Sequence, residues 1–289
     1  MDSVVFFLIQ VLNGVQYGLL LFVVASGLTL VFGIMGIVNL AHGSFYMVGA
    51  YLAFALTQAT GNLWLAILLA VPLTVVLGLA LELLFRPLYR RDHLYQVLLT
   101  YGLILVFEEG RSLLFGDDVH GVPIPAWLTV SLPLTADLSY PVYRLGISAV
   151  CLALAGGMYL VIARTRLGMA IRAGSSNREM VQLLGIDIGW LNRMVFAAGV
   201  ALAGFAGMIA APVATVFPGM GNEILILSFV VVVIGGIGSI KGAFLGALLI
   251  GLADTFGQVF APSVAGMTVY VLMAAVLLWR PAGLFGRGA

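Results

Sequence analysis

The sequence predicts an all-α protein, a polytopic transmembrane helical bundle of about eight to nine spans. Its 289 residues are 62% hydrophobic and only 9% charged, whereas a soluble domain carries roughly 25% charged residues. The apolar residues form successive runs of about 20, the length that crosses a bilayer. Two glycine-rich segments interrupt these runs. Because no polar stretch is long enough for a soluble domain, residues 1–289 are expected to form a single transmembrane domain.

The candidate spans follow one another along the whole chain. They cover 4–32, a segment that follows the first interruption and ends near 58, and then 63–85, 94–115, 141–163, 194–216, 224–237, 241–260 and 267–279. The count of nine falls to eight if one interrupted segment only re-enters the membrane. A polar loop covers 116–140, and the longest polar segment covers 164–193.

The distribution of Lys and Arg predicts the orientation, since cytoplasmic loops of membrane proteins carry an excess of these residues. Only Arg111 and Arg144 fall on one side of the membrane. The other eleven fall on the opposite side: Arg86, Arg90, Arg91, Arg164, Arg166, Arg172, Arg178, Arg193, Lys241, Arg280 and Arg287. We therefore expect loop 164–193 and the C-terminus to be cytoplasmic, and loop 116–140 and the N-terminus to be outside.

The first interruption lies at 33–49 and combines glycines with polar residues. Backbone polar groups at membrane depth must be paired internally, so this segment has to be buried in protein or line a watery cavity. We expect a discontinuous or re-entrant element beside a translocation path; the alternative is a short cytoplasmic turn. The helix-breaking glycines are Gly36 and Gly43, and the expected path-lining residues are Asn39, His42 and Ser44.

The second interruption lies at 235–246, where Gly242-Ala243-Phe244 faintly repeats Gly43-Ser44-Phe45. Paired interruptions in two halves of a chain indicate an internal repeat around a central pathway. The alternative is an ordinary tight turn between two spans. The segment lacks the Gly-Lys-Ser/Thr of a phosphate-binding loop. Its helix-breaking glycines are Gly235, Gly236, Gly238 and Gly242.

Three polar residues within the long apolar runs are further candidates for the path. Asn13 and Tyr17 are four residues apart and share one face of the first span, and polar side chains in a membrane face the bundle or a cavity. Asp254 and Gln258 form the deepest polar pair outside the interruptions. The Asp254 carboxylate is either a hydrogen-bonded anchor or an ion-binding site.

Other reactive residues have structural interpretations. His42 has no Cys, His or carboxylate neighbour at ligand spacing, so we expect no metal. The single cysteine, Cys151, lies in an apolar run and is expected to be a packing residue. Glu82 precedes Arg86 by one helical turn, the spacing of an ion pair at the membrane interface. No pair of catalytic residues points to an intramembrane enzyme.

The polar segment 164–193 contains the pattern of a short helix. Asn177 is a plausible N-cap, and Glu179 lies in the first turn that follows. Gly185 ends the segment as a C-cap would. Met180, Leu183 and Leu184 form an apolar stripe on one face. This stripe either lies on the membrane or the bundle, or docks a cytoplasmic protein.

Four motifs occur in order along the chain: Gly27-Leu-Thr-Leu-Val-Phe-Gly-Ile-Met-Gly-Ile-Val-Asn-Leu-Ala-His-Gly43, then Arg172-Ala173 with 177–180 and 183–186, then 235–242 and 280–286. Together they resemble the motifs of a known family, the LivH-type permease subunits of branched-chain amino acid ABC importers. Residue 176 departs from the family pattern, because Ser176 stands where an acidic residue is usual.

The resemblance implies a bacterial inner-membrane permease that binds no cofactor and is not itself an enzyme. It would work with two cytoplasmic ATP-binding subunits, a second homologous permease and a periplasmic substrate-binding protein. The 177–185 helix would then be the segment that docks an ATPase. The implied substrates are branched-chain or related small amino acids. Alternatives are urea or short amides, or an ion-coupled secondary transporter that uses Asp254.

Overall fold

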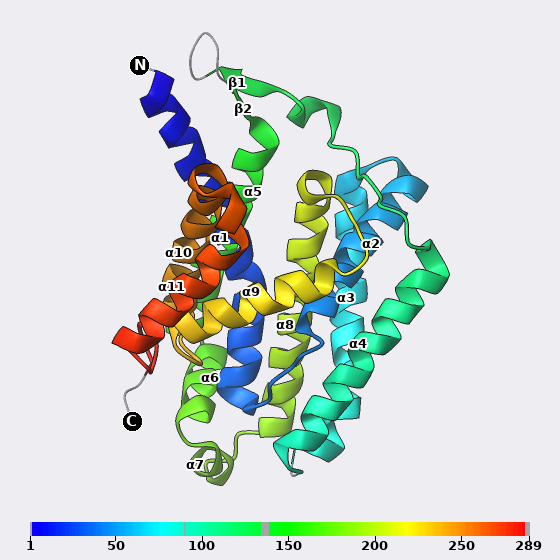
Figure 1. The fold of residues 1–289 in the computed structure, drawn as a ribbon. Helices are drawn as coiled ribbons and strands as arrows, with labels where there is room; N and C mark the ends of the chain where they lie inside the picture. The colour runs from blue at the N-terminus through cyan, green and yellow to red at the C-terminus, as the bar shows by residue number, and fades with distance from the viewer. Residues whose placement is uncertain (1, 90, 134–138, 287–289) are drawn as a thin grey trace.

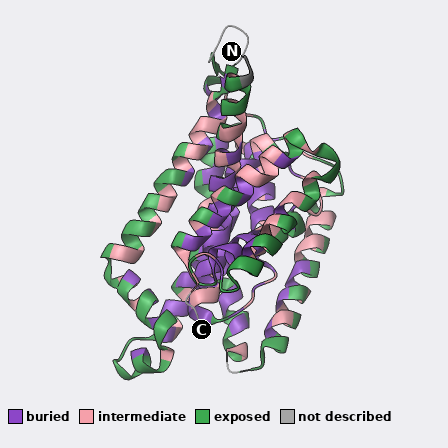
Figure 2. Ribbon diagram, turned by 60° about the vertical axis from the view of Figure 1, so that its left-hand side comes forward, coloured by how far each residue is buried: buried purple, intermediate pink, exposed green. Residues whose placement is uncertain are grey.

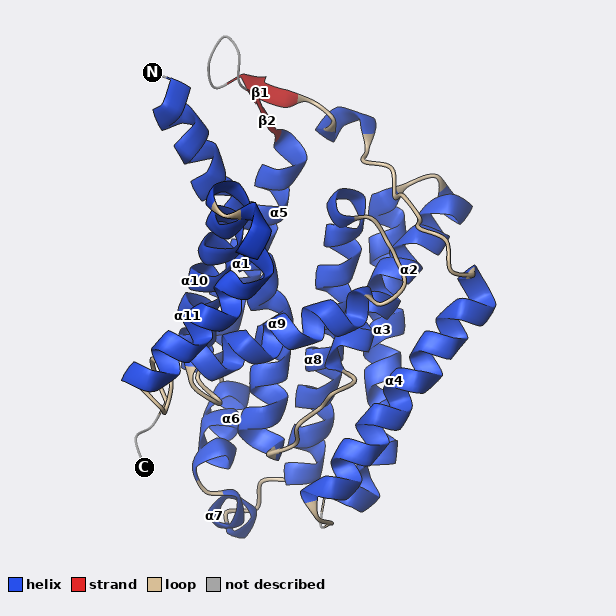
Figure 3. Cartoon of the chain, viewed as in Figure 1, coloured by secondary structure: helices blue, strands red, loops and turns tan. Residues whose placement is uncertain are grey.

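The computed structural model describes residues 2–89, 91–133 and 139–286. This part of the chain is all-α, as predicted, with eleven α-helices and one two-stranded hairpin (Figures 1 and 3). The helices are α1 (Asp2–Met35), α2 (His42–Thr60), α3 (Leu63–Phe85), α4 (His93–Phe115), α5 (Val142–Arg164), α6 (Arg166–Ser176), α7 (Arg178–Leu183), α8 (Ile188–Ala214), α9 (Met220–Gly235), α10 (Ile240–Phe260) and α11 (Ala265–Trp279).

Helix α1 forms the centre of the bundle. Leu21, Val24, Ala25 and Leu28 are fully buried, because the helix is apolar on all sides and is surrounded by α5, α8, α9 and α10. Figure 2 shows the buried residues concentrated along this axis, with exposed faces on the outer helices. The fully buried Cys151 is a packing residue, as predicted.

Six described helical segments are long and apolar enough to cross a membrane: Val4–Met35, Leu63–Leu88, Val142–Arg164, Ile188–Ala214, Ile240–Phe260 and Pro262–Trp279. Helix α9 is apolar but shorter. The protein is therefore a polytopic membrane protein, and the predicted spans coincide with helices. The ion pair predicted between Glu82 and Arg86 is present at the end of α3. Oε2 of the buried Glu82 lies 3.1 Å from Nε of Arg86.

Helix α2 begins inside the bundle, because the chain turns back after α1 (Figure 1). Gly36, with φ +65°, ends α1, and residues 36–41 run without regular structure. Nε2 of His42, the first residue of α2, lies 2.9 Å from the carbonyl oxygen of Val24. Val24 is eleven residues before Met35, so α2 starts about 16 Å inside the end of α1. The predicted discontinuous element is therefore present.

Helix α9 also begins inside the bundle, against the start of α2. A Cβ on Gly43 would overlap the carbonyl oxygen of Gly221, so only glycine allows this approach. From this contact α9 runs to the end of the bundle where Gly238 lies beside Gly33 of α1. Helix α2 runs to the opposite end. The loop before α9, residues 215–219, is the second interior break.

The second interruption expected at 235–246 is instead the tight turn given as its alternative. Residues 236–239 join α9 to α10, and the Ser239 hydroxyl caps α10 by accepting a hydrogen bond from the Gly242 amide, 3.1 Å away. Gly235 and Gly242 permit α9 and α10 to touch backbone to backbone. These glycines therefore serve helix packing and turn geometry, not re-entry.

The C-terminal residues return to this turn. The amides of Leu284 and Phe285 donate hydrogen bonds to the carbonyl oxygens of Ile234 and Gly235, at 2.8 and 3.0 Å. Each helix leaves its last carbonyls without internal partners, so this tail completes the end of α9.

The connections differ in their regularity. In the part of loop 116–140 that the structure describes, β1 (Ser131–Pro133) pairs antiparallel with β2 (Ser139–Pro141), with Leu132 opposite Tyr140. The polar segment 164–193 is mostly helical, because α6 and α7 occupy it and α8 already begins at Ile188. Only one short helix was predicted there from the sequence. Arg90 and Arg287 lie outside the described residues.

Candidate functional site

A polar cavity of about 570 Å³ lies among α1, α5, α8 and α10, toward the end of the bundle that carries the β1–β2 hairpin. Polar side chains are rare in membrane-spanning helices, and those that occur face the interior of the bundle or a water-filled space. The polar lining therefore marks this cavity as a candidate site. The lining consists of Gln10, Asn13, Gln16, Tyr17, Leu20, Tyr46, Arg144, Ile147, Ala210, Val213, Ala214, Asp254, Thr255, Gln258 and Val259.

Two opposite charges share this cavity without pairing with each other. Nη1 of Arg144 donates to Oδ1 of Asn13 at 3.0 Å. Nε2 of Gln258 donates to Oδ2 of Asp254 at 2.8 Å. Within the described ranges neither Arg144 nor Asp254 forms an ion pair. Each charge is held by a neutral amide, so hydrogen-bonding capacity remains on both for a bound solute.

Packing around the cavity holds the two charged residues in place. The hydroxyl of Tyr143, next to Arg144, donates to the carbonyl oxygen of Ile209 at 2.9 Å and fixes the start of α5 against α8. On the other wall, Gly251 of α10 lies directly against the backbone of Gly14 and Gly18 of α1. This close approach, which small residues permit, positions Asp254 one turn further along α10.

The structure brings together only some of the predicted path residues. Asn13, Tyr17 and Asp254 all line the cavity. Sequence reasoning missed Arg144, Gln16 and Tyr46. A signal for Arg144 was present, since it is one of two basic residues on the side that otherwise lacks them. Tyr46 lies within the first interruption at 33–49, but only Asn39, His42 and Ser44 were expected there to line the path.

The predicted residues of the first break lie elsewhere, in the packed interior. Asn39 and His42 are fully buried and Ser44 is 4% exposed; none lines a described cavity. Oδ1 of Asn39 accepts a hydrogen bond from the Ala41 amide at 3.0 Å. This bond gives the Ala41 N–H, which lies in the irregular segment, a hydrogen-bond partner. Nδ2 of Asn39 and Nδ1 of His42 have no partner among the described residues. The described ranges contain no metal-binding group of His, Cys, Asp and Glu.

The second predicted site, the short helix, is present as α7. Oδ1 of Asn177 accepts from the Met180 amide at 3.0 Å, and Gly185, with φ +80°, follows the end of the helix. Glu179 lies in its first turn. Buried Val181 holds α7 to the bundle. The stripe residues are outside: Met180, Leu183 and Leu184 are 53%, 82% and 72% exposed.

Comparison with known proteins assigns this architecture to a family. The family model described as "Branched-chain amino acid transport system / permease component" matches residues 10–279, nearly the whole chain. The chain belongs to this family. Its membership agrees with the multi-helix membrane fold and with the motifs on α1, α7 and the α9–α10 turn.

Two branched-chain amino acid permeases are similar to the chain over almost their full lengths, and a ribose permease over a smaller part. The high-affinity branched-chain amino acid transport system permease protein BraD of Pseudomonas aeruginosa is 31% identical, over 99% of this chain and 98% of its own. The permease protein LivH of Salmonella typhimurium is 28% identical, over 99% and 97%. The ribose import permease RbsC of Haemophilus influenzae is 25% identical over 80% of this chain and 72% of its own. No solved structure matches the chain.

Proposed function

We propose that this chain is the translocation subunit of an ATP-driven importer for branched-chain or related small α-amino acids. The polar cavity is the observation that carries this proposal. An α-amino acid has a carboxylate and an ammonium group on one carbon. Arg144 can donate a charge-assisted pair of hydrogen bonds to the carboxylate, and Asp254 can accept from the ammonium.

The unpaired state of Arg144 and Asp254 supports a zwitterionic solute. Charges in a membrane are costly and are retained where they have a partner or a function. Here both charges face one cavity, and among the described residues each is hydrogen-bonded to an amide and forms no ion pair. A zwitterion satisfies both at once and is itself neutral. Its apolar side chain has Leu20, Ile147 and Val213 as neighbours.

The proposed assembly follows from family membership and from α7. The chain would pair with a second, homologous permease, two cytoplasmic ATP-binding subunits and a periplasmic substrate-binding protein. The exposed stripe of α7 supports an ATPase contact, because apolar side chains on a short polar-flanked helix need a covering partner. The excess of Arg at the α7 end supports its cytoplasmic placement, with the N-terminus outside and the C-terminus cytoplasmic.

Two alternatives have specific support. Related permeases that carry urea or short amides would use the amides Gln10, Asn13, Gln16 and Gln258 of the cavity and would not need its charges. An ion-coupled transporter would use Asp254 as its cation site. Its carboxylate is then the group whose occupancy shifts the conformational equilibrium.

The test is uptake into vesicles that contain the co-purified complex and the binding protein. We expect ATP to drive uptake of branched-chain amino acids with the proton and sodium gradients collapsed, and no uptake of urea or acetamide. Uptake of only the neutral amides would replace the amino-acid proposal. Amino-acid uptake that vanishes with the gradients despite ATP would establish the ion-coupled alternative.

A further inference from the structure

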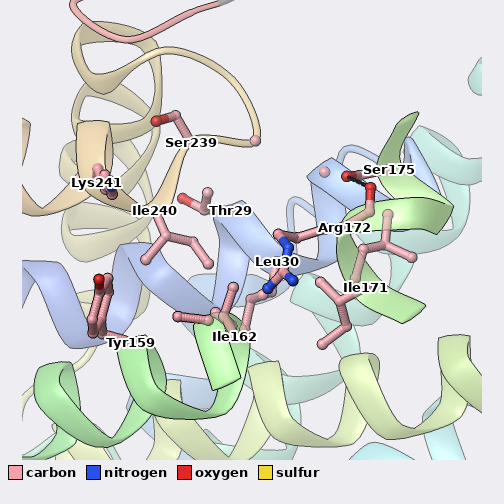
Figure 4. A pocket seen from close by; sticks show the side chains of 14 residues that line it. Thr29, Leu30, Tyr159, Ile162, Ile171, Arg172, Ser175, Ser239, Ile240 and Lys241 are labelled. Carbon is pink, nitrogen blue, oxygen red and sulfur yellow. Dashed lines mark hydrogen bonds between the residues drawn. The ribbon is translucent and has the colours of Figure 1, made fainter. Parts of the chain in front are cut away.

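A second, basic cleft lies at the α7 end of the bundle, on the far side of the packed middle of α1 from the polar cavity. It has a volume of about 430 Å³ and lies between α1, α5, α6 and the α9–α10 turn. Figure 4 shows Arg172 of α6 and Lys241 of α10 at opposite sides of this cleft, with Leu30 and Ile162 between them.

The positive charge of this cleft is uncompensated. The side chains of Arg172 and Lys241 form no ion pair or hydrogen bond within the part of the chain that the structure describes. No Asp or Glu lines the cleft, whereas the hydroxyls of Thr29, Ser175 and Ser239 do. The Thr29 and Ser175 hydroxyls already donate to the carbonyl oxygens of Ala25 and Arg172. Among the described residues the Ser239 hydroxyl only accepts, from the Gly242 amide, so its proton is available to a ligand. Two cations with one such hydroxyl donor form a site for a phosphate-bearing anion.

An apolar groove continues directly from this basic cleft. The groove, of about 540 Å³, runs between α5 and α8 and shares Leu30, Ile162 and Ile171 with the cleft. Its lining is almost wholly apolar and includes Gly157, Met158 and Phe205. An occupant that fits both parts has an anionic head and a hydrocarbon tail.

We propose that the cleft and the groove together bind one anionic phospholipid. The phosphate would lie between Arg172 and Lys241, and an acyl chain would lie along the α5–α8 groove. The location suits this ligand, because the cleft is at the ends of α1 and α5 and the start of α10, where headgroups meet hydrocarbon. Basic pockets between transmembrane helices bind anionic headgroups in this way.

The lipid ties together parts of the bundle that share few other contacts. Little of helix α5 is buried, and it contacts α8 at few positions. A bound acyl chain fills the space between them. Its headgroup joins α6, which leads directly into α7, to the start of α10. Lipid occupancy thus couples the position of the α6–α7 segment to the transmembrane helices.

The test is native mass spectrometry of the full-length permease in detergent, titrated with phosphatidylglycerol or with phosphatidylcholine of the same acyl chains. We expect selective retention of phosphatidylglycerol. Replacing both charges, Arg172→Gln with Lys241→Gln, should weaken that binding roughly thirtyfold. Arg91→Gln, an exposed basic residue at the same end of the bundle, should leave it unchanged.

Substitutions at two adjacent glycines of α5 test the binding of the acyl chain separately from that of the headgroup. A side chain at Gly156 or Gly157 meets no atom within 4 Å of its Cβ, so both leucine variants should fold. Only Gly157 lines the groove. Gly157→Leu should therefore reduce phosphatidylglycerol binding at least tenfold, while Gly156→Leu should not.

Three results would overturn the proposal. Undiminished phosphatidylglycerol binding in the double Gln variant would remove the headgroup site. Equal binding by Gly157→Leu and Gly156→Leu would remove the groove. Competition by millimolar inorganic phosphate, with no dependence on either leucine variant, would show that the cleft binds a free anion and not a lipid.

Discussion

Gly43 and Gly221 meet backbone to backbone at the point where α2 and α9 both begin. The two helices then run to opposite ends of the bundle. This contact fixes the interior starts of both helices, and it leaves no room for a side chain on Gly43.

Gly43→Ala should therefore destabilise the permease by about 1–3 kcal/mol, the usual cost of overpacking a filled core. The new methyl group would force the start of α2 away from the Gly221 carbonyl. Thermal unfolding in detergent measures the effect. Gly102→Ala on α4, where nothing lies within 4 Å, is the matched control and should be neutral or slightly stabilising. Equal melting temperatures for the two variants would contradict the close contact.

Leu184→Asp should abolish copurification with the ATP-binding subunit while leaving the permease inserted in the membrane. Leu184 is 72% exposed on the α7 stripe, so a carboxylate there harms an interface but not the fold. His93→Asp adds an acid at an exposed position, the first residue of α4, and should copurify normally. Normal recovery of the ATPase with Leu184→Asp would remove the docking role of α7.

Cysteine labelling should distinguish the polar cavity from the broken segment, in a Cys151→Ala background. Asn13→Cys lies in the cavity and should react with a small water-soluble thiol reagent without nucleotide. Ser44→Cys is buried beside the α2–α9 contact, so it should react only in a nucleotide state that separates these helices. Protection of position 44 in every state would mean that the first break is a static packed element.

Arg144→Gln and Asp254→Asn should each raise the amino-acid concentration for half-maximal uptake by about ten- to a hundredfold. Each removes one charge-assisted contact to the zwitterion and preserves most of the side-chain shape. Thr255→Val, a change of lining without a change of charge, serves as the control. If both charge variants match the wild type while uptake persists, amino acids cross by another route.

Tyr89→Phe should destabilise the loop between α3 and α4 by about 1 kcal/mol. The Tyr89 hydroxyl donates to Oε1 of the buried Glu82 at 2.8 Å. Burial, and then this bond, raise the pKa of Tyr89. A raised pKa in the folded state means that the stabilisation is complete below the ordinary value of about 10 and declines as the pH rises above it.

Urea unfolding of Tyr89→Phe and wild type at pH 7 and pH 11 measures this effect. The difference in unfolding free energy between the two should shrink at the higher pH. A difference that is equal at both pH values would show that the hydroxyl contributes nothing through its proton.

Most helices could be predicted from sequence because length and composition alone determine a span. The N-cap at Asn177 and the end of the helix at Gly185 could also be predicted, since both depend on local backbone chemistry. The start of α9 inside the bundle could not be predicted from the sequence. Residues Gly221, Asn222 and Glu223 look like a polar loop, and only tertiary contact with α2 makes them the first turn of a helix.

The polar cavity shows the same limit. Asn13 and Tyr17 could be assigned to it from their shared helical face. Arg144 stood out by its charge but could not be placed beside Asn13, because their 131-residue separation gives no local signal for their hydrogen bond. Predicting it requires knowledge of which helices are neighbours.

The tail that completes α9 has a consequence for biosynthesis. The amides that pair with Ile234 and Gly235 belong to residues that follow them by 50 positions, at 284 and 285. During translation α9 and α10 are therefore synthesised before the partners of these carbonyl oxygens exist. The bundle is therefore closed by residues made about 50 positions after the end of α9, and a chain truncated just before Leu284 would leave these two carbonyl oxygens without partners.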